Sequence, residues 1–328
     1  MSFDFSIRPR RLRENSVLRE MIAENSLTVN DLIFPVFVSN EIRDRQEISS
    51  MPGIYRWSLP SLLKQIPEWI DLGIRAFAIF PCVEKEMKDE TGSEILNSNA
   101  LTYEAARKIK SNWAETLLIG DLALDPYTIH GHDGILDSDG QIANDPTVEI
   151  LAKASVLAGN SGYDMVAPSD MMDGRVSIIR KHLDSANLLH TGILAYSAKF
   201  CSAYYGPFRE AIGSTTQAPI NKSTYQLNPA NRNESIKELH LDLAEGADIL
   251  MIKPAEPYLD VISYAKDNFN VPIAAYQVSG EYSRLVAAAS CGWLDLDKCA
   301  QESILSIKRA GANLILSYFA ERMARILF

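Results

Sequence analysis

The chain has 328 residues, of which 47% are apolar, and it carries a formal net charge of −10. This length and apolar content suit a well-packed globular protein, either one large domain with an extension or two domains. The acidic balance argues against nucleic acid as the main partner, and no apolar run approaches the ~20 residues that a membrane helix requires. The four cysteines are scattered and include no CxxC pair, so we expect reduced thiols in a cytoplasmic protein.

Residues 1–30 differ from the rest of the chain because they are basic. A disordered tail for nucleic acid is one interpretation of this segment. We favour an arm that lies on the acidic surface of a neighbouring subunit, because apolar residues between positions 18 and 27 give it surface to bury. Its first thirteen residues have no apolar core after their charges, so we do not expect a secretory signal. The basic residues are Arg8, Arg10, Arg11, Arg13 and Arg19.

From residue 31 onward, short apolar runs alternate with helical patterns. Eight such strands predict a closed (β/α)₈ TIM barrel at 31–328, which we interpret as the catalytic domain. A doubly wound open sheet is the alternative, but no GxGxxG follows the first strand to support it. The expected strands lie at 32–38, 76–81, 116–124, 164–168, 192–197, 249–254, 272–278 and 314–319, and the expected helices at 58–72, 100–114, 145–160, 174–186, 233–246, 258–268 and 295–310.

Two connections are too long to be simple turns between a strand and a helix. Residues 125–144 are polar and rich in Gly and Asp, and residues 198–232 carry several aromatic residues, glycines and prolines. Loops of this length in a compact domain are usually functional. We interpret 198–232 as a lid that excludes water from the active site.

Two lysines lie at the ends of apolar strands. Lys199 follows the strand at 192–197, and Lys253 ends the strand at 249–254. A single lysine at such a place is more often one that extends into water. A buried amine with a lowered pKa could instead attack a ketone and form a Schiff base. Two lysines on adjacent strands are expected to lower each other's pKa by repulsion, which favours the catalytic interpretation.

Several longer motifs make the chain resemble the porphobilinogen synthases, also called 5-aminolaevulinate dehydratases. The resemblance runs from residue 8 to residue 319, with its motifs in order. These motifs are 125–128 (DPYT), 130–134 (HGHDG), 167–175 (APSDMMDGR), 196–200 (YSAKF), 205–209 (YGPFR), 251–254 (MIKP) and 277–282 (QVSGEY).

The resemblance implies condensation of two 5-aminolaevulinate molecules to porphobilinogen with loss of two waters, in haem biosynthesis. It implies that Lys253 binds the propionate-side substrate, whose carboxylate Ser279 and Tyr318 would bind. Lys199 would bind the acetate-side substrate. Arg209 and Lys222 would grip the carboxylate of that second molecule. Many relatives have Arg at the position of Lys222, and a lysine is a point charge rather than a two-pronged donor, so the grip is expected to be looser.

Relatives that use catalytic zinc carry three cysteines near the third strand, where this chain has Ala123, Asp125 and Asp133. Thiolates are the soft ligands that zinc prefers, so we expect no active-site zinc. His130 and His132 remain in this loop, but an i, i+2 pair is weak support for zinc. We expect Asp121, Asp125 and Asp133 to hold the amino group of the acetate-side substrate, through water or a cation.

Glu238 lies on the expected helix at 233–246 and, from the residues alone, would be a solvated carboxylate. In magnesium-using relatives the matching residue contacts an allosteric Mg²⁺ away from the active site, and one carboxylate with waters is a normal Mg²⁺ site. The resemblance thus implies a magnesium-responsive enzyme. It also implies a homo-octamer, in which the arm reaches a neighbouring subunit.

Two other functions were weighed. A class I aldolase barrel needs only one lysine and usually a phosphate site after the seventh and eighth strands, but 277–282 has a single glycine. A barrel that only binds or scaffolds would have lysines with ordinary pKa values. Borohydride trapping distinguishes the three functions: a porphobilinogen synthase should trap two substrate equivalents, an aldolase one, and a barrel that only binds none.

Overall fold

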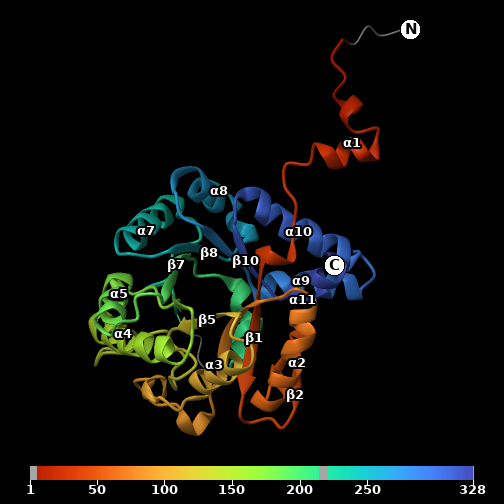
Figure 1. The fold of residues 1–328 in the computed structure, drawn as a ribbon. Helices are drawn as coiled ribbons and strands as arrows, with labels where there is room; N and C mark the ends of the chain where they lie inside the picture. The colour runs from red at the N-terminus through yellow and green to blue at the C-terminus, as the bar shows by residue number, and fades with distance from the viewer. Residues whose placement is uncertain (1–5, 214–220, 328) are drawn as a thin grey trace.

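A computed structural model describes residues 6–213 and 221–327 of the protein. Eight parallel strands close on themselves, because the last strand pairs with the first, and this confirms the predicted (β/α)₈ barrel (Figure 1). In order around the barrel the strands are β1 (Leu32–Ser39), β4 (Ala76–Cys82), β5 (Leu117–Leu122), β6 (Met165–Pro168), β7 (Gly192–Lys199), β8 (Ile249–Lys253), β9 (Ile273–Gln277) and β10 (Leu314–Ser317).

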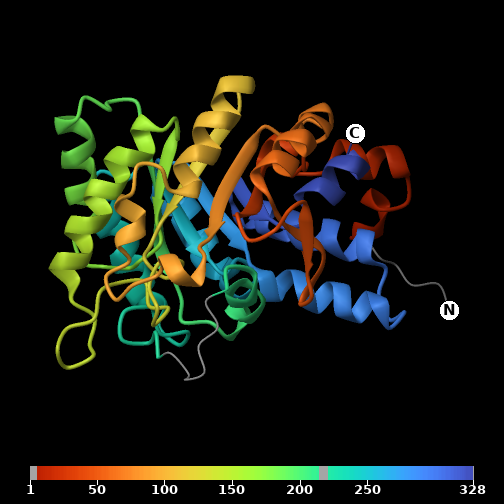
Figure 2. The same ribbon diagram turned by 90° about the horizontal axis from the view of Figure 1, so that it is seen from below.

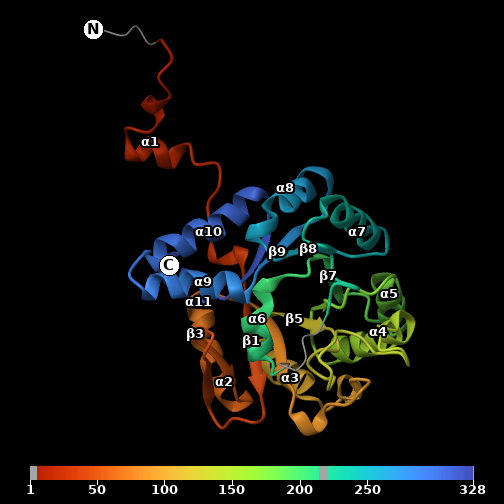
Figure 3. The ribbon, with the colours of Figure 1, turned by 180° about the vertical axis from the view of Figure 1, so that it is seen from behind.

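Helices cover the outside of this barrel (Figures 1 and 3). Their ends follow local chemistry: Asp295 accepts a hydrogen bond from the backbone of Lys298 to start α10, and Gly311, at φ 122°, ends it. The long helices are α2 (Leu59–Asp71), α3 (Leu101–Asn112), α4 (Asn144–Asn160), α5 (Arg175–Ser185), α7 (Arg232–Ala244), α8 (Leu259–Asn268), α9 (Ser279–Ser290), α10 (Leu296–Ala310) and α11 (Ala320–Leu327).

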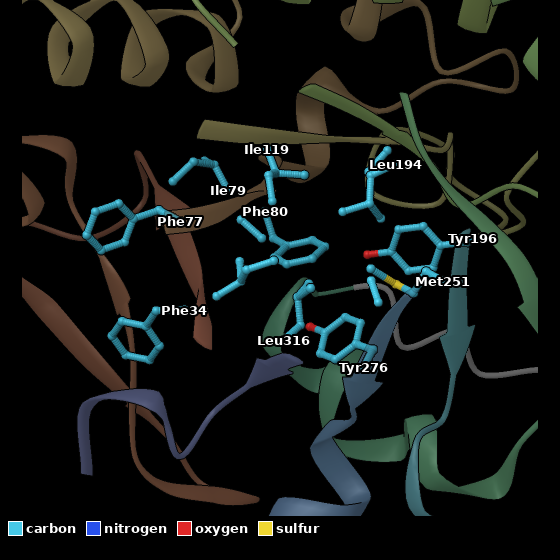
Figure 4. Close-up of a cluster of buried hydrophobic side chains, with 14 of the residues drawn as sticks. Phe34, Phe77, Ile79, Phe80, Ile119, Leu194, Tyr196, Met251, Tyr276 and Leu316 are labelled. Carbon is cyan, nitrogen blue, oxygen red and sulfur yellow. The ribbon is translucent and has the colours of Figure 1, made fainter. Parts of the chain in front are cut away.

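Large side chains fill the interior of the barrel (Figure 4). Phe80, Tyr196 and Tyr276 come from three different strands, and all are almost fully buried. Their rings meet near the middle of the cluster, with the Phe80 and Tyr276 centroids 6.3 Å apart. The barrel is therefore a packed core whose aromatic side chains support whatever lies at the ends of the strands.

A hairpin outside the barrel was not predicted from the sequence. It consists of β2 (Arg45–Ile48) and β3 (Met51–Trp57), and β3 extends the sheet by pairing in parallel with β1, where Phe37 is the partner of Arg56. Pro52 and Gly53 lie within β3, so in the sequence this segment looks like a turn rather than a strand. The hairpin brings Arg56 to the end of the barrel at which β1 finishes.

The amino-terminal arm extends away from the barrel (Figures 1 and 3). It contains a 3₁₀ turn (Pro9–Leu12) and the short helix α1 (Ser16–Met21). Large apolar side chains on it are exposed, including Ile7 and Met21 at 83% and 78%. The described part of the chain contains no helix long and apolar enough to cross a membrane.

Candidate active site

The two predicted lysines lie side by side. Lys199 ends β7, Lys253 ends β8, and the two residues are paired in the register of these parallel strands. Both side chains are buried, with exposures of 4% and 6%. The connection at 123–143 and the short helix α6 (Gly206–Ala211) lie at this same end of the barrel (Figure 2). Two amines therefore share one enclosed site at the carboxyl ends of adjacent strands, as the sequence predicted.

Lys253 is surrounded by aromatic rings. Its Nζ lies 4.8 Å from the ring centroid of Tyr276, 5.0 Å from that of Tyr196, and 5.1 Å from those of Tyr205 and Phe208. Ring faces attract an ammonium ion, but they replace water only in part. Burial is the main cause that lowers the pKa of Lys253 to about 7, and the charge of Lys199 adds to it. Near neutral pH a large share of this amine is therefore unprotonated and nucleophilic.

Lys199 has the opposite environment. Its Nζ donates to Asp133 Oδ1 at 2.9 Å and also to the backbone carbonyl of Ser169. Burial opposes its charge, but the carboxylates of Asp133 and Asp125 outweigh burial and raise the pKa of Lys199. The expectation that both lysines have a lowered pKa was therefore wrong for Lys199, because the sequence did not reveal which carboxylates lie beside it.

Asp133 is the centre of the polar half of the site. Besides Lys199, it accepts hydrogen bonds on Oδ2 from Lys222 Nζ and from the Tyr225 hydroxyl, each at 2.7 Å. Burial opposes its ionisation, but Lys199 and Lys222 hold the pKa of Asp133 well below its usual range. Asp133 is thus a buried carboxylate that compensates two ammonium ions.

Asp121 and Asp125 stand near this cluster but are less well compensated. Asp125 Oδ2 lies 3.8 Å from Lys222 Nζ, which is at the limit of an ion pair. Burial and the charge of Asp133 raise the pKa of Asp125. Burial and the charge of Asp125 likewise raise the pKa of Asp121 to about 7. The site therefore contains one carboxyl group, that of Asp121, whose pKa of about 7 lets it hold a proton near neutral pH.

Ser279 and Tyr318 lie on the apolar side. Ser279 is the first residue of α9, a helix that the sequence did not predict. Its hydroxyl accepts from the backbone N–H of Phe208 at 3.0 Å and donates to the carbonyl of Tyr204 at 3.2 Å. The Tyr318 hydroxyl shares a hydrogen bond of 2.7 Å with Tyr276. Both hydroxyls have protein partners here, so binding a carboxylate requires them to redirect their protons.

The predicted lid at 198–232 is described only in part, because residues 214–220 lie outside the described residues. Its first part forms α6, which carries Phe208 and Arg209. Arg209 is half-buried, and its guanidinium has no hydrogen bond or ion pair with any other described residue. The second part returns Lys222 and Tyr225 to Asp133. The structure thus joins Lys222 to the polar cluster, but it does not join Arg209 to that cluster.

Glu238 lies away from the lysines, on α7. It borders a cavity of about 330 Å³ whose lining also includes Asp173, Glu234 and Tyr225. Burial raises the pKa of Glu238, and Asp242 and Asp173 add to that rise against the opposing charge of Arg175. Glu238 is therefore partly covered and partly exposed to solvent. Among the described residues, no group of three or more His, Cys, Asp or Glu is placed to hold a metal ion.

Several residues of the site were not identified from the sequence. Tyr225 contacts Asp133, and its hydroxyl also lies 3.1 Å from His132 Nδ1. Gln226 is buried, and its Oε1 has no hydrogen-bond partner in the described part of the chain. The sequence signal that could have identified Tyr225 and Gln226 was their position just after Lys222, in a segment interpreted as a lid. A polar residue in such a segment can turn inward, although spacing alone does not tell which one does.

Known proteins resemble this chain over almost its whole length. The family profile described as "Delta-aminolevulinic acid dehydratase" matches residues 6–326. Curated proteins of that name from Bradyrhizobium diazoefficiens and Synechocystis are 47% and 46% identical over 323 residues each, covering 98% of this chain and 91% and 98% of theirs. A crystal structure of the porphobilinogen synthase from Toxoplasma gondii, titled as a complex with porphobilinogen, aligns with a TM-score of 0.96 at 42% identity, covering 98% of this chain and 92% of that one. The chain belongs to the delta-aminolevulinic acid dehydratase family.

Proposed function

We propose that the protein condenses two molecules of 5-aminolaevulinate to porphobilinogen with loss of two waters, as a lyase of porphyrin and haem biosynthesis. The observation that carries this proposal is the pair of buried lysines at Cα-paired positions on β7 and β8. Two amines suit two ketone substrates, because each can hold one as a Schiff base. Family membership favours this function over an aldolase with a single lysine and over a barrel that only binds.

Lys253 is proposed to react first, with the propionate-side substrate. Its pKa of about 7, lowered mainly by burial, leaves the amine free to attack the substrate ketone. Attack and loss of water give a protonated imine. That imine withdraws electrons and acidifies the adjacent carbon, which can then form a bond with the second substrate. The surrounding rings of Tyr196, Tyr205 and Tyr276 limit hydrolysis by excluding water.

Lys199 is proposed to hold the acetate-side substrate. Its ammonium is charged and must lose a proton before it can attack, and Asp133 at 2.9 Å accepts a hydrogen bond from it. Asp121 and Asp125, whose pKa values are raised, are proposed to help bind the amino group of this substrate and to exchange protons with it. When each imine forms, the departing hydroxyl group must take up a proton to leave as water, and these carboxyl groups would supply that proton.

The substrate carboxylates are proposed to lie on opposite sides of the site. The propionate-side carboxylate would accept hydrogen bonds from the hydroxyl groups of Ser279 and Tyr318. These two residues lie against Phe208 and Tyr276. Lys222 would leave part of its contact with Asp133 to bind the acetate-side carboxylate. Arg209, which has no partner among the described residues, would bind that same carboxylate with two parallel donors.

We propose that no zinc takes part in the reaction. The matching ligand positions hold Ala123, Asp125 and Asp133, so no thiolate is available there. Asp133 is already committed to Lys199, Lys222 and Tyr225. These contacts suit an amine-binding cluster better than a zinc site.

We propose that Glu238 holds an allosteric Mg²⁺. The proposal is supported by the cavity of about 330 Å³ beside Glu238, in which Glu238 would be the protein ligand of a hydrated ion. Asp173 and Glu234 line the same cavity, but the three carboxylates do not form a group placed to hold a metal ion directly. Mg²⁺ keeps several waters and needs few protein carboxylates. When bound, the ion would supply positive charge to this acidic cavity. The lid residues 223–227 line the cavity and would interact electrostatically with that charge.

We propose that the arm at 1–30 binds a neighbouring subunit and supports a homo-octamer. Ile7, Val17 and Met21 are exposed on the arm at 83%, 59% and 78%, and such surface gains stability when another chain covers it. A cytoplasmic location is proposed as well, supported by four cysteines that are all unpaired thiols.

The test is direct. Purified protein is supplied with 5-aminolaevulinate, and porphobilinogen is measured together with the mass of protein reduced by borohydride. Turnover with substrate adducts at Lys253 and Lys199 is expected. Turnover without any adduct would remove the Schiff-base mechanism, and adducts without porphobilinogen would remove the proposed product.

A further inference from the structure

The short helix α6 is fastened at its carboxyl end by side chains from outside the lid. Arg56 of β3 donates from Nε to the carbonyl of Ala211 at 2.6 Å and from Nη2 to the carbonyl of Glu210. Cys82, at the end of β4, donates its thiol to the same Ala211 carbonyl at 3.1 Å. The last carbonyls of a helix lack partners within the helix. The Glu210 carbonyl also accepts from the backbone N–H of Gly213 at 3.2 Å, whereas the Ala211 carbonyl has no backbone partner among the described residues and relies on Arg56 and Cys82.

The opposite end of α6 and the turn before it are fastened as well. The Ser279 hydroxyl bonds to the backbone of Phe208 and Tyr204. Gly280 approaches so closely that a Cβ there would lie 2.6 Å from the Tyr204 carbonyl oxygen. The described start of the lid is therefore held between α9 on one side and the β2–β3 hairpin on the other.

This helix matters because of what it carries. Phe208, at its centre, places its ring 5.1 Å from Lys253 Nζ and packs against Phe37 and Phe80, with centroids 5.8 and 5.3 Å away. Arg209 is the next residue. A shift of α6 would therefore move one wall of the Lys253 pocket and the proposed carboxylate ligand together.

We propose that Arg56 is a positioning residue for the reaction: by holding the Glu210 and Ala211 carbonyls it fixes α6, and through α6 it keeps Phe208 over Lys253 and Arg209 at the site. This inference rests on the proposed function. Arg56 is itself held, because its Nη1 donates to Gln46 Oε1 at 3.3 Å and its backbone belongs to β3 beside β1. The hairpin outside the barrel thus serves the active site.

Loss of this contact should change the chemistry of Lys253. Water that enters beside a displaced Phe208 reduces the cost of charging the amine, so the pKa of Lys253 rises towards that of an exposed lysine. Less of the amine is then neutral, and the acid limb of activity moves to higher pH. Most other groups that face Lys253 stay in place, since they belong to other elements: Lys199, Asp121, Asp125, Asp133 and the rings of Tyr196 and Tyr276. Tyr205 directly precedes α6, but its hydroxyl donates to the Phe200 carbonyl at 2.7 Å, outside the helix.

The experiment compares wild type with Arg56→Ala, Arg56→Gln and Arg56→Lys by measuring kcat and KM for porphobilinogen formation across pH. The matched control is Arg45→Ala, which removes an exposed guanidinium of the same hairpin that packs on Tyr55 and Trp57 rather than on α6. Thermal unfolding is recorded for each variant. Arg56→Gln keeps much of the side-chain length without the charge, so it carries the test if Arg56→Ala does not fold.

We expect Arg56→Ala and Arg56→Gln to lower kcat/KM about a hundredfold, because small displacements of reacting groups have effects of that size. Their acid limb should move up, and Arg56→Lys, which keeps one charged donor, should restore part of both losses. Arg45→Ala should match wild type. A folded Arg56→Gln variant with the wild-type acid limb and kcat/KM overturns the inference, as does lost activity with an unmoved acid limb. Wild type that forms no porphobilinogen overturns the proposed function instead.

Discussion

The two lysines occupy paired positions on neighbouring strands, yet their surroundings differ. Four aromatic rings surround the amine of Lys253, whereas the amine of Lys199 bonds to Asp133 and to a backbone carbonyl. Accordingly, the pKa of Lys253 is lowered to about 7 by burial, and that of Lys199 is raised by carboxylates that outweigh burial. The same residue type in the same register thus has a lowered pKa in one environment and a raised pKa in the other.

This difference gives an order to the proposed reaction. The charge of Lys199 contributes to the low pKa of Lys253, so the polar pocket helps to activate the apolar one. Filling the Lys253 pocket first leaves Lys199 charged until a second substrate disturbs Asp133. Mutations in the surroundings of either lysine should therefore test this difference between Lys253 and Lys199.

The largest effect is expected from Lys253→Ala, which should reduce turnover at least about a thousandfold, because no other amine of the described residues lies among the four aromatic rings. Lys253→Arg should fail equally, since a guanidinium stays protonated. Borohydride trapping followed by mass spectrometry provides the check. The matched variant Lys199→Ala should also lose turnover but still trap one substrate, at Lys253. Trapping by neither variant would refute the division into two pockets.

Asp133→Asn attacks the polar pocket. It leaves the ammonium ions of Lys199 and Lys222 buried without their shared carboxylate, and breaking a buried pair costs about 3–5 kcal/mol. We expect a lower free energy of unfolding in urea and a turnover loss of about a hundredfold. Glu149→Gln, which removes an exposed partner of Lys153, is the control and should change the free energy of unfolding far less than Asp133→Asn does. Equal stability of the two variants would show that Asp133 does not compensate the lysines.

A pH series sharpens the contrast without mutation. Of the two site lysines, Lys253 has the lowered pKa, about 7, so its neutral fraction falls about tenfold per unit as pH drops below that value. Single-turnover trapping at Lys253 should follow this limb. Trapping at Lys199 in the free protein should require higher pH, because its pKa is raised. Identical profiles for the two lysines, resolved by peptide mapping, would remove the electrostatic distinction.

The smallest effect on the chemistry is expected from Glu238→Ala. Maximal turnover should stay near that of wild type, because Glu238 lies outside both lysine pockets, but stimulation by Mg²⁺ should disappear. Activity should then depend more strongly on protein concentration, as expected if the ion favours one assembly. Deleting residues 1–13 should act in the same direction. The measurement is specific activity against protein concentration with and without Mg²⁺, and superimposed curves for wild type and Glu238→Ala would leave Glu238 without a magnesium role.

The barrel could be predicted because its strands are continuous apolar runs with glycines at several turns, and such patterns are local. The hairpin strand β3 could not, since Pro52 and Gly53 conceal it and its pairing with β1 is a tertiary contact. Helix α9 was missed because its first residues, Ser279 and Gly280, look like a loop. The presence of Ser279 and Gly280 at the start of this helix is explained by tertiary contacts, because both residues lie against the backbone of the lid.

In the active site, too, local sequence patterns could be predicted and tertiary contacts could not. The two lysines could be placed at strand ends, because strand order alone brings them together. Which carboxylate reaches which lysine depends on how the 125–144 loop folds back, and that determines whether a pKa rises or falls. The contact between Tyr225 and Asp133 joins two loops far apart in the chain and leaves no periodic signal.

The pairing of β1 with β10, in which Leu32 is the partner of Ile315, has a consequence for synthesis in the cell. A nascent chain that still lacks β10 has made both lysines, yet its β1 and β9 remain open edges ready to pair with other chains. Closure joins residues separated by almost the whole chain, which makes it a late step. We therefore expect activity to appear only after β10 has been made and has paired with β1, and chains stalled before β10 to be clients of chaperones that protect strand edges.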